Sequence, residues 1–389
     1  MNNITLRTTS TALQLHCSTC GKTHTIHEVQ SVSTCCESAL LVDYDLDLSI
    51  DKSELSNLAN GMWRYESLLP VFEYSNRVSM GEGMTPLISL RHTFRRFGFE
   101  NVYLKDESGN PTGSFKARGI SVAVSKALEL GVETVVIPTA GNAGGALSAY
   151  GKRAGLNVIV VMPRLTPEPF KEEVISYGAE LILVDGLINA CGKMAQKIEE
   201  VKNAFNMSTL MEPYRIEGKK TMGLEIVEQL KWEVPDVIIY PTGGGTGIIG
   251  IWKALQEMEI LGWIDSKRPR MIAVQSENCQ PVVDALANKT INPDLYKPSV
   301  ANGLVVPNPV GLTMINNIIN VSGGKAISVK EEDIMLGIDD LANSEGILPS
   351  PEGGAVWAAF MKMLEARELH FKERIVLMNT ASGYKYSGH

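Results

Sequence analysis

The chain has 389 residues, of which 44% are hydrophobic and 21% are charged, and its formal net charge at neutral pH is −8. This length suits two or three domains, and the acidic balance argues against nucleic acid as a partner, because nucleic-acid binding needs a basic surface. No apolar run reaches the roughly 18 residues of a transmembrane helix, and the first residues lack the pattern of a secretory signal, so no membrane partner is predicted. Six cysteines are too few for a disulfide scaffold in a chain of this size, which favours a cytoplasmic protein with reduced thiols.

The first 60 residues are predicted to form a separate cysteine-containing extension. Cys17 and Cys20 are spaced as C-x-x-C, and Cys35 and Cys36 follow as an adjacent pair. A zinc ribbon usually holds its metal with two C-x-x-C pairs arranged as a tetrahedron. Because the second pair has lost its spacer, its two sulfurs are expected to fit poorly into one tetrahedron. The pattern therefore indicates a degenerate, zinc-ribbon-like extension over residues 1–60.

Two interpretations of this extension stay open. In one, a structural zinc is held by Cys17, Cys20 and a later cysteine, with His24 or His27 able to complete the set. In the other interpretation the ribbon packs without metal, and the missing spacer between Cys35 and Cys36 favours this one. None of the residues predicted below to form the cofactor site lies before Thr85, so we expect removal of a metal to leave the cofactor site intact.

Short apolar runs alternate with longer amphipathic segments from about residue 100 onward. Buried strands are predicted at Val135–Pro138, Val158–Pro163, Leu181–Val184, Val237–Tyr240, Met271–Val274 and Ile375–Met378. Continuous apolar strands alternating with helices are typical of an α/β fold whose parallel sheets are covered on both faces. Such sheets bind ligands beyond the carboxyl ends of their strands, so the glycine-rich strand exits are the candidate sites. Residues 290–310, which contain several prolines and asparagines, are expected to form a long loop.

The segment YLKDESGNPTGSFKARG, residues 103–119, contains the candidate catalytic lysine. We predict that a strand ends at Lys105, that the Asn-Pro pair turns the chain, and that a helix begins near Phe115. Lys116 then lies in the first helical turn, where the positive end of the helix dipole disfavours the ammonium form and so favours a nucleophilic amine. Taken alone, a solvated lysine at the start of a surface helix is the commoner explanation.

Three further motifs follow predicted strands. They are PTAGNAGG at 138–145, YPTGGGTGIIG at 240–250 and LMNTASGYKY at 377–386. Bare backbone amides at a glycine-rich turn into a helix suit a phosphate group without any cation. The second of these motifs also satisfies G-x-G-x-x-G, so a dinucleotide site is an alternative. That alternative explains neither the lysine motif nor the asparagine of PTAGNAGG.

In this order, the four motifs resemble those of the fold-type II pyridoxal-phosphate (PLP) enzymes, the tryptophan synthase β-like group to which threonine synthase and the serine/threonine dehydratases belong. The resemblance runs from about Trp63 to the C-terminus. It implies two open parallel-sheet domains, namely a large PLP-binding domain of residues 61–100 plus 213–389 and a small mobile domain of residues 101–212. It also implies a homodimer and a Schiff base between PLP and Lys116.

The resemblance assigns the remaining site residues by position. It implies that Asn142 binds the 3′-oxygen of the cofactor and that a hydroxyl residue near the C-terminus, Thr380 or alternatively Ser382, contacts the pyridine nitrogen. The substrate carboxylate is expected at Thr139 and at the amides around Ala140, Gly141, Asn142 and Ala143. The cofactor phosphate is expected at Gly243, Gly244, Gly245, Thr246 and Gly247.

The reaction is expected to be that of threonine synthase, which the N-terminal cysteines, GEGMTPL at 81–87, NPTGSFK and the terminal GYKY resemble. On this model O-phospho-L-homoserine and water give L-threonine and phosphate, with Lys116 as the general base. Arg215 matches the arginine that binds the substrate phosphate, and Thr85 is expected to assist it. The alternative for Arg215 is an ordinary ion pair near the head of a helix at 217–230.

Two departures from the threonine synthase pattern keep other reactions open. Leu210-Met211-Glu212 replaces an Asn-Ser pair, which puts an acidic residue beside the expected phosphate pocket, and SPEG at 350–353 leaves Glu352 without an assigned role. The alternatives are a serine/threonine or diaminopropionate ammonia-lyase and a cysteate-synthase-like β-replacement enzyme. A non-catalytic PLP-fold protein ranks last, because Lys116 is intact.

Overall fold

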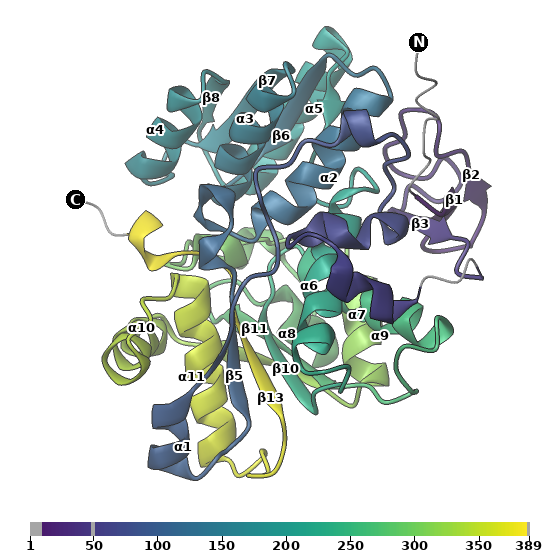
Figure 1. Cartoon of the computed structure of the whole chain (residues 1–389). Helices are drawn as coiled ribbons and strands as arrows, with labels where there is room; N and C mark the ends of the chain where they lie inside the picture. The colour runs from purple at the N-terminus through teal and green to yellow at the C-terminus, as the bar shows by residue number, and fades with distance from the viewer. Residues whose placement is uncertain (1–9, 48–50, 387–389) are drawn as a thin grey trace.

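The computed structural model describes residues 10–47 and 51–386, and the strands within them form three sheets (Figure 1). A three-stranded sheet has the order β2-β1-β3, a six-stranded sheet has the order β12-β11-β10-β13-β5-β4, and a four-stranded sheet has the order β8-β7-β6-β9. The first nine residues, on which the prediction of no secretory signal partly rests, lie outside the described part. In the described part, every helix is too short or too polar to cross a membrane.

The bounds of the elements follow in chain order. The strands are β1 (Ala12–Cys17), β2 (Thr23–His24), β3 (Leu40–Tyr44), β4 (Leu87–Ser89), β5 (Val102–Asp106), β6 (Thr134–Pro138), β7 (Asn157–Pro163), β8 (Glu180–Val184), β9 (Phe205–Asn206), β10 (Val237–Pro241), β11 (Arg270–Ser276), β12 (Lys325–Val329) and β13 (Ile375–Asn379). The α-helices are α1 (Arg91–Phe97), α2 (Lys116–Glu129), α3 (Asn142–Arg153), α4 (Glu168–Ser176), α5 (Ile188–Lys202), α6 (Arg215–Gln229), α7 (Thr246–Ile260), α8 (Pro281–Leu286), α9 (Leu312–Val321), α10 (Glu331–Glu345) and α11 (Pro351–Glu365). Short 3-10 helices include η2 (Met62–Leu68), η4 (Glu107–Gly109), η5 (Pro111–Gly113), η6 (Pro293–Leu295), η7 (Asn302–Leu304) and η8 (Gly383–Lys385).

The α/β architecture with parallel sheets is confirmed, and each of the six predicted strands forms. All pairings in the two larger sheets are parallel except that of β4 with β5. The boundary expected at residue 101 would put β5 in the small domain, whereas β5 pairs with β13 in the six-stranded sheet. An apolar run predicts a buried strand but does not say which sheet it joins, which explains this difference. The division into a large and a small mobile domain stays a prediction.

Both larger sheets are covered on two faces, because successive side chains of a single strand pack into different cores on opposite faces. On β10, Ile238 packs in a core with α6 and α7, whereas Val237 and Ile239 pack on the opposite face with α11. On β6, Val135 packs with α2 and α3, whereas Val136 packs with α5. Successive side chains of a strand point to opposite faces, so an apolar residue at every position is what a doubly covered sheet requires.

The four motifs lie at the carboxyl ends of parallel strands, as predicted. PTAGNAGG leads from β6 into α3, YPTGGGTG leads from β10 into α7, and NTASGYKY follows β13. The lysine segment follows β5 through η4 and η5 to the start of α2. The expected long loop at 290–310 is present and contains only η6 and η7 as regular structure.

The cysteine-containing module, shown in purple at one side of Figure 1, is docked on α6 and α7. The hydroxyl of Tyr44 donates to Oε2 of Glu217 at 2.9 Å, and Nζ of Lys253 donates to the carbonyl of Val42 at 2.6 Å. Tyr44 is also held by the cation of Lys220, whose Nζ lies 3.9 Å from the ring centroid. Charged and polar contacts therefore tie the module to α6 and α7, while its buried Leu15, Leu40 and Val42 belong to the same apolar core as α2 and α3.

Candidate active site

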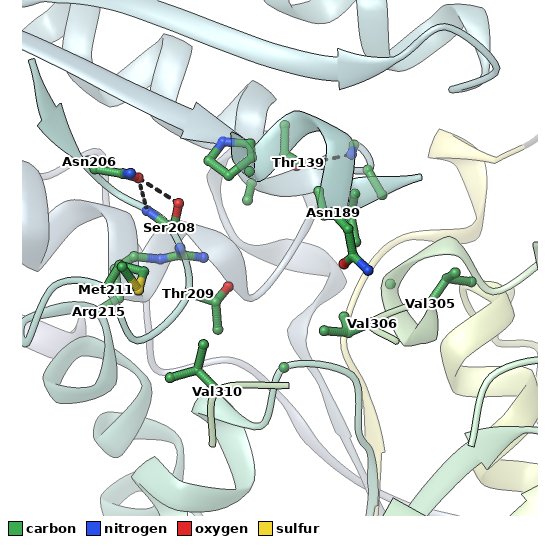
Figure 2. Close-up of a pocket in the computed structure, with 18 of the residues that line it drawn as sticks. Thr139, Asn189, Asn206, Ser208, Thr209, Met211, Arg215, Val305, Val306 and Val310 are labelled. Atoms are coloured by element: carbon green, nitrogen blue, oxygen red, sulfur yellow. Dashed lines mark hydrogen bonds between the residues drawn. The ribbon is translucent and has the colours of Figure 1, made fainter. Parts of the chain in front are cut away.

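A cavity of about 740 Å³ lies where the strand-exit motifs converge (Figure 2). Predicted site residues in its wall are Lys116, Thr139, Ala140, Gly141, Asn142, Ala143, Arg215 and Gly244. The structure thus brings together residues from α2, from the β6–α3 loop, from α6 and from the β10–α7 loop. Figure 2 shows Thr139 and Asn189 on one side of the cavity, with Val305, Val306 and Val310 from the long loop across from them.

Lys116 is the first residue of α2, as predicted, and its side chain faces the cavity. Burial, and then the positive charge of Arg215, lower the pKa of its amine to about 7, against the opposing effect of the Glu352 carboxylate. The helix start is anchored by the buried guanidinium of Arg118, which forms ion pairs with Glu107 and Glu225 at 2.6 Å each. Lys116 therefore combines a fixed position with an amine that is substantially neutral near pH 7.

A second buried amine lies close to Lys116. Nζ of Lys219 donates to the carbonyl of Phe115 and lies 3.8 Å from the centroid of the Phe115 ring. Burial, and then the charges of Lys116 and Arg215, hold the pKa of Lys219 well below its usual value. Sequence reasoning missed Lys219, although it lies one helical turn after Arg215 on α6.

The asparagine loop is held by its own polar groups and by the C-terminal segment. Nδ2 of Asn142 donates to the hydroxyl of Tyr386 at 2.8 Å, while its Oδ1 is buried without a hydrogen-bond partner among the described residues. The amide of Gly141 donates to the Thr139 hydroxyl at 3.0 Å. Gly141 has φ +149°, and a Cβ there would meet the Phe170 ring at 3.0 Å, so this turn requires glycine.

The GGGTG loop wraps the N-terminus of α7 with close backbone contacts. A Cβ on Gly243 would lie 2.2 Å from the carbonyl oxygen of Gly303, and one on Gly244 would lie 2.7 Å from Thr209. Gly245 has φ +87° immediately before the helix. The three glycines carry no side chains, so nothing covers the backbone amides of the loop or the positive N-terminal end of α7. This arrangement suits an anion such as phosphate.

Arg215 begins α6 and is 2% exposed. Its Nη1 donates to the carbonyl of Met207 at 2.7 Å, whereas its Nε has no hydrogen-bond partner among the described residues. Burial lowers the pKa of this guanidinium, opposed by Glu212. A buried guanidinium with an unused donor, facing a cavity, is suited to an oxyanion ligand.

Glu212 does not line the cavity, and its carboxyl group binds the backbone at the start of α6. Its Oε2 accepts hydrogen bonds from the amides of Tyr214 at 2.7 Å and Arg215 at 3.0 Å. Burial raises the pKa of this carboxyl to about 7, against the lowering effect of Arg215. The electrostatic objection raised by the sequence is therefore weaker than expected, because near neutral pH this group is only partly ionised.

Some predicted site residues lie outside the cavity wall. The Thr85 hydroxyl donates to Oε1 of Glu107 at 2.6 Å in the buried ion-pair network. The carbonyl of Thr380 accepts from the amide of Phe115 at 2.9 Å, so Thr380 adjoins the lysine segment. Ser382 lines a separate, smaller pocket with Gly113 and Lys385. Gly243, Gly245, Thr246 and Gly247 belong to the same loop and helix start as Gly244, but only Gly244 of this group lines the cavity.

The structure also adds residues that the sequence analysis did not assign. Glu352 is 4% exposed; its Oε1 accepts from the amide of Gly303 at 2.8 Å, and its Oε2 has no hydrogen-bond partner within residues 10–47 and 51–386. Ser31 and Val32, from the cysteine module, line the cavity. No motif could have identified them, because they approach the cavity only through the docking of the module.

The four cysteines of the module lie together. The sulfurs of Cys17, Cys20, Cys35 and Cys36 are all within 4.8 Å of one another. Zn–S bonds of about 2.3 Å in a tetrahedron place sulfurs about 3.8 Å apart, so the adjacent pair fits one group better than the sequence suggested. His27 stacks on Phe72 with ring centroids 5.3 Å apart, whereas Nε2 of His24 is 3.8 Å from the Cys35 sulfur.

Comparison with known proteins supplies the family. Residues 78–381 match the family of pyridoxal-phosphate dependent enzymes. The chain belongs to this family. It is 36% identical to a threonine synthase of Methanocaldococcus jannaschii over 95% of this chain and 92% of that protein. It is 33% identical to a threonine synthase of Halalkalibacterium halodurans over 82% of this chain and 88% of that protein.

Solved structures of PLP-dependent enzymes share the fold. A PLP-dependent aspartate racemase matches with a TM-score of 0.67 at 22% identity, covering 77% of this chain and 90% of that one. An O-ureido-L-serine synthase matches with a TM-score of 0.66 at 21% identity, covering 85% of this chain and 93% of that one. These likenesses confirm the fold-type II architecture.

The residues of this PLP-dependent enzyme fit the cofactor that the family implies. Lys116 offers a partly neutral amine in the cavity wall, and Asn142 offers a side-chain amide whose oxygen is unpaired, so that half a turn of the amide presents its NH₂ group as a donor. The loop before α7 offers bare amides at the start of a 15-residue helix. These groups match the three needs of PLP, which are an amine, a polar partner for the ring oxygen and a site for the phosphate.

Proposed function

We propose that this protein is a threonine synthase, which converts O-phospho-L-homoserine and water to L-threonine and phosphate. The observation that carries the proposal is the 36% identity with the threonine synthase of M. jannaschii over 95% of the chain. The cavity supports it, because a candidate general base, Lys116, and a buried cation, Arg215, line the same space. A phosphorylated substrate needs such a cation, since the cofactor supplies none for it.

Each group in the cavity has a defined task in this reaction. Bound PLP supplies an electron sink for charge at Cα of the substrate. Nζ of Lys116 removes the Cα proton and then carries protons at Cβ and Cγ, while phosphate leaves from Cγ and water adds at Cβ. Arg215 binds the substrate phosphate, and Thr85, whose hydroxyl donates to Glu107, is given no part in this task. Asn142 orients the cofactor ring through its 3′-oxygen.

The other ends of substrate and cofactor are held by backbone and hydroxyl groups. The Thr139 hydroxyl and the amides of the β6–α3 loop bind the substrate carboxylate, and the loop before α7 binds the cofactor phosphate. Thr380 serves the pyridine nitrogen, since it adjoins Phe115 and Lys116 whereas Ser382 faces another pocket. A neutral hydroxyl does not force protonation of that nitrogen, and the resulting milder sink suits elimination and replacement better than transamination.

The experiment that tests the proposal offers several substrates to the PLP-loaded protein. O-phospho-L-homoserine, L-threonine, L-serine and O-phospho-L-serine are incubated separately, and release of phosphate and of ketoacid is followed. Phosphate release with threonine formation from phosphohomoserine alone is the expected result. Ketoacid release from serine or threonine that is faster than phosphate release from phosphohomoserine would indicate an ammonia-lyase instead of a threonine synthase. Phosphate release from phosphoserine would favour a β-replacement enzyme.

We also propose one structural zinc in the cysteine module. The support is the donor set, because four thiols within 4.8 Å of one another form a Cys₄ group. Cys17 sits at the end of β1, and Cys36 lies four residues before β3, so a metal here would tie the two strands together. Zinc in such a site would stabilise the module by coupling metal binding to local folding.

A further inference from the structure

The cysteine module reaches the substrate cavity through one short segment. Ser31 and Val32 form part of the cavity wall, and Oγ of Ser31 donates to the carbonyl of Met211 at 2.8 Å. Met211 and Arg215 both line the cavity and are labelled in Figure 2. The segment therefore meets the cavity at the end where the proposed phosphate-binding arginine lies.

The next residue of the same segment is bound to the cysteine cluster. Ser33 is 1% exposed, and its Oγ donates to the sulfur of Cys17 at 3.2 Å while accepting from the amide of Ser38 at 3.1 Å. The backbone of Ser33 pairs with the same loop, since its amide donates to the carbonyl of Ser38 at 2.8 Å and its carbonyl accepts from Glu37 at 2.9 Å. The contacts with Ser38 and Glu37 hold Ser33 to the loop that carries Cys35 and Cys36, and the bond to Cys17 ties it to the end of β1.

The distance between the cluster and the cavity is short. Two residue steps separate Ser31 from Ser33, which is at most about 7 Å of extended chain. A shift of the cysteine loop would thus be passed directly to Val32 and to the Ser31–Met211 hydrogen bond. The groups expected to hold the cofactor come from α2, α3, the loop and helix start at α7 and the segment after β13, and none comes from the module.

We propose that residues 31–33 are a specificity-determining wall of the substrate site, and that the metal-loaded cysteine cluster positions this wall. This inference rests on the proposed function and names a part of its substrate site. Ser31 and Val32 shape the space beside Met211 for the phosphate end of the substrate, and Ser33 fixes them to the cluster. The wall acts on substrate affinity, whereas cofactor attachment and the proton transfers of Lys116 do not depend on it.

The test uses the full-length, PLP-loaded enzyme and the variants Ser31→Ala and Ser33→Ala. Thr25→Ala is the matched control, because Thr25 lies exposed in the same module and also uses its hydroxyl, which accepts from the amide of His27 at 3.2 Å. For Ser31→Ala and Ser33→Ala we expect KM for O-phospho-L-homoserine to rise roughly 2- to 13-fold, the range of one neutral hydrogen bond. We expect kcat and PLP content to stay within about twofold of the wild type.

A second measurement does not need turnover. Chelation of the metal in the wild-type enzyme should weaken binding of inorganic phosphate and speed hydrogen exchange in residues 207–212, with PLP still bound. KM values of Ser31→Ala and Ser33→Ala no higher than that of Thr25→Ala would overturn the inference. So would unchanged phosphate binding and exchange after chelation, or a protein that takes up no metal. Absence of turnover in the metal-loaded wild type, with the chelation effects present, would instead overturn the proposed function alone.

Discussion

The side-chain amide of Asn142 donates to the hydroxyl of Tyr386 at 2.8 Å across 244 residues of sequence. This bond joins the β6–α3 loop of the four-stranded sheet to the segment that follows β13 of the six-stranded sheet. The unpaired Oδ1 of the same side chain shows that only part of its hydrogen-bonding capacity is used. Rotation of the amide by half a turn would let Oδ1 accept from Tyr386 and would free the NH₂ group for the cofactor oxygen.

Lys116 and Lys219 provide a matched test of cofactor attachment. Borohydride reduction of the PLP-loaded protein should fix the cofactor on Lys116, because this amine lines the cavity and has a pKa of about 7. Lys116→Ala should leave no covalently fixed cofactor and no turnover, whereas Lys219→Met should keep the modified lysine at 116. Peptide mapping by mass spectrometry identifies the site. Full activity of Lys116→Ala would contradict the assignment.

Arg215→Ala should reduce activity on a phosphorylated substrate far more than activity on an unphosphorylated one. Loss of a charge-assisted contact costs about 1.5–3 kcal/mol, which corresponds to a fall of roughly 10- to 150-fold in kcat/KM for phosphohomoserine. Arg215→Lys should recover part of the loss, since it keeps the charge without the planar fork. The same variants are assayed with an unphosphorylated amino acid, and equal losses on both substrates would show that Arg215 is structural.

Glu352→Gln should change the pH dependence of cofactor capture. The Glu352 carboxylate raises the pKa of Lys116, against burial and Arg215, which lower it. Removing this negative charge therefore lowers the Lys116 pKa further, and the neutral amine persists to lower pH. The rate at which apoenzyme binds PLP covalently, followed by absorbance between pH 5 and 9, should reach its half-maximum at lower pH than in the wild type. An unchanged pH of half-maximal rate would show that Glu352 does not raise the pKa of Lys116.

Glu212→Gln should flatten the dependence of stability on pH. The carboxyl has a pKa raised from 4.5 to about 7 in the folded protein, so between these values the folded state keeps a proton that the unfolded chain has released. Stability therefore falls as pH rises through this window, by at most about 3 kcal/mol. The Tm of the wild type should decrease more from pH 5 to 7.5 than that of Glu212→Gln. The exposed Glu277, changed to Gln, is the control and should follow the wild type.

Elemental analysis tests the zinc proposal. About one zinc per chain is expected, and Cys17→Ser with Cys20→Ser should abolish it. Loss of the metal should lower the thermal stability of the module, measured by hydrogen exchange in residues 10–47. A protein that contains no zinc after reconstitution, and whose double variant unfolds at the wild-type temperature, would show that the cysteine cluster packs without metal.

Local pattern was enough to predict the α/β class, the six strands and the position of Lys116 at a helix start. These features depend on periodicity, on turn residues and on the rule that parallel strands present their ligands at one edge. The motifs around Asn142 and Gly244 were predictable for the same reason, because each follows a strand directly and carries the glycines that its turn requires.

Other features depend on contacts between segments distant in sequence. Nothing in the run VYLKD says that β5 pairs with β13, and nothing near Ser31 indicates that it meets Met211, 180 residues away. The orientation of Glu212 toward the α6 amides, the burial that lowers the Lys116 pKa and the meeting of four sulfurs from two loops likewise exist only once the chain is packed. Desolvation and hydrogen-bond partners are properties of the assembled interior, so the tertiary structure alone decided them.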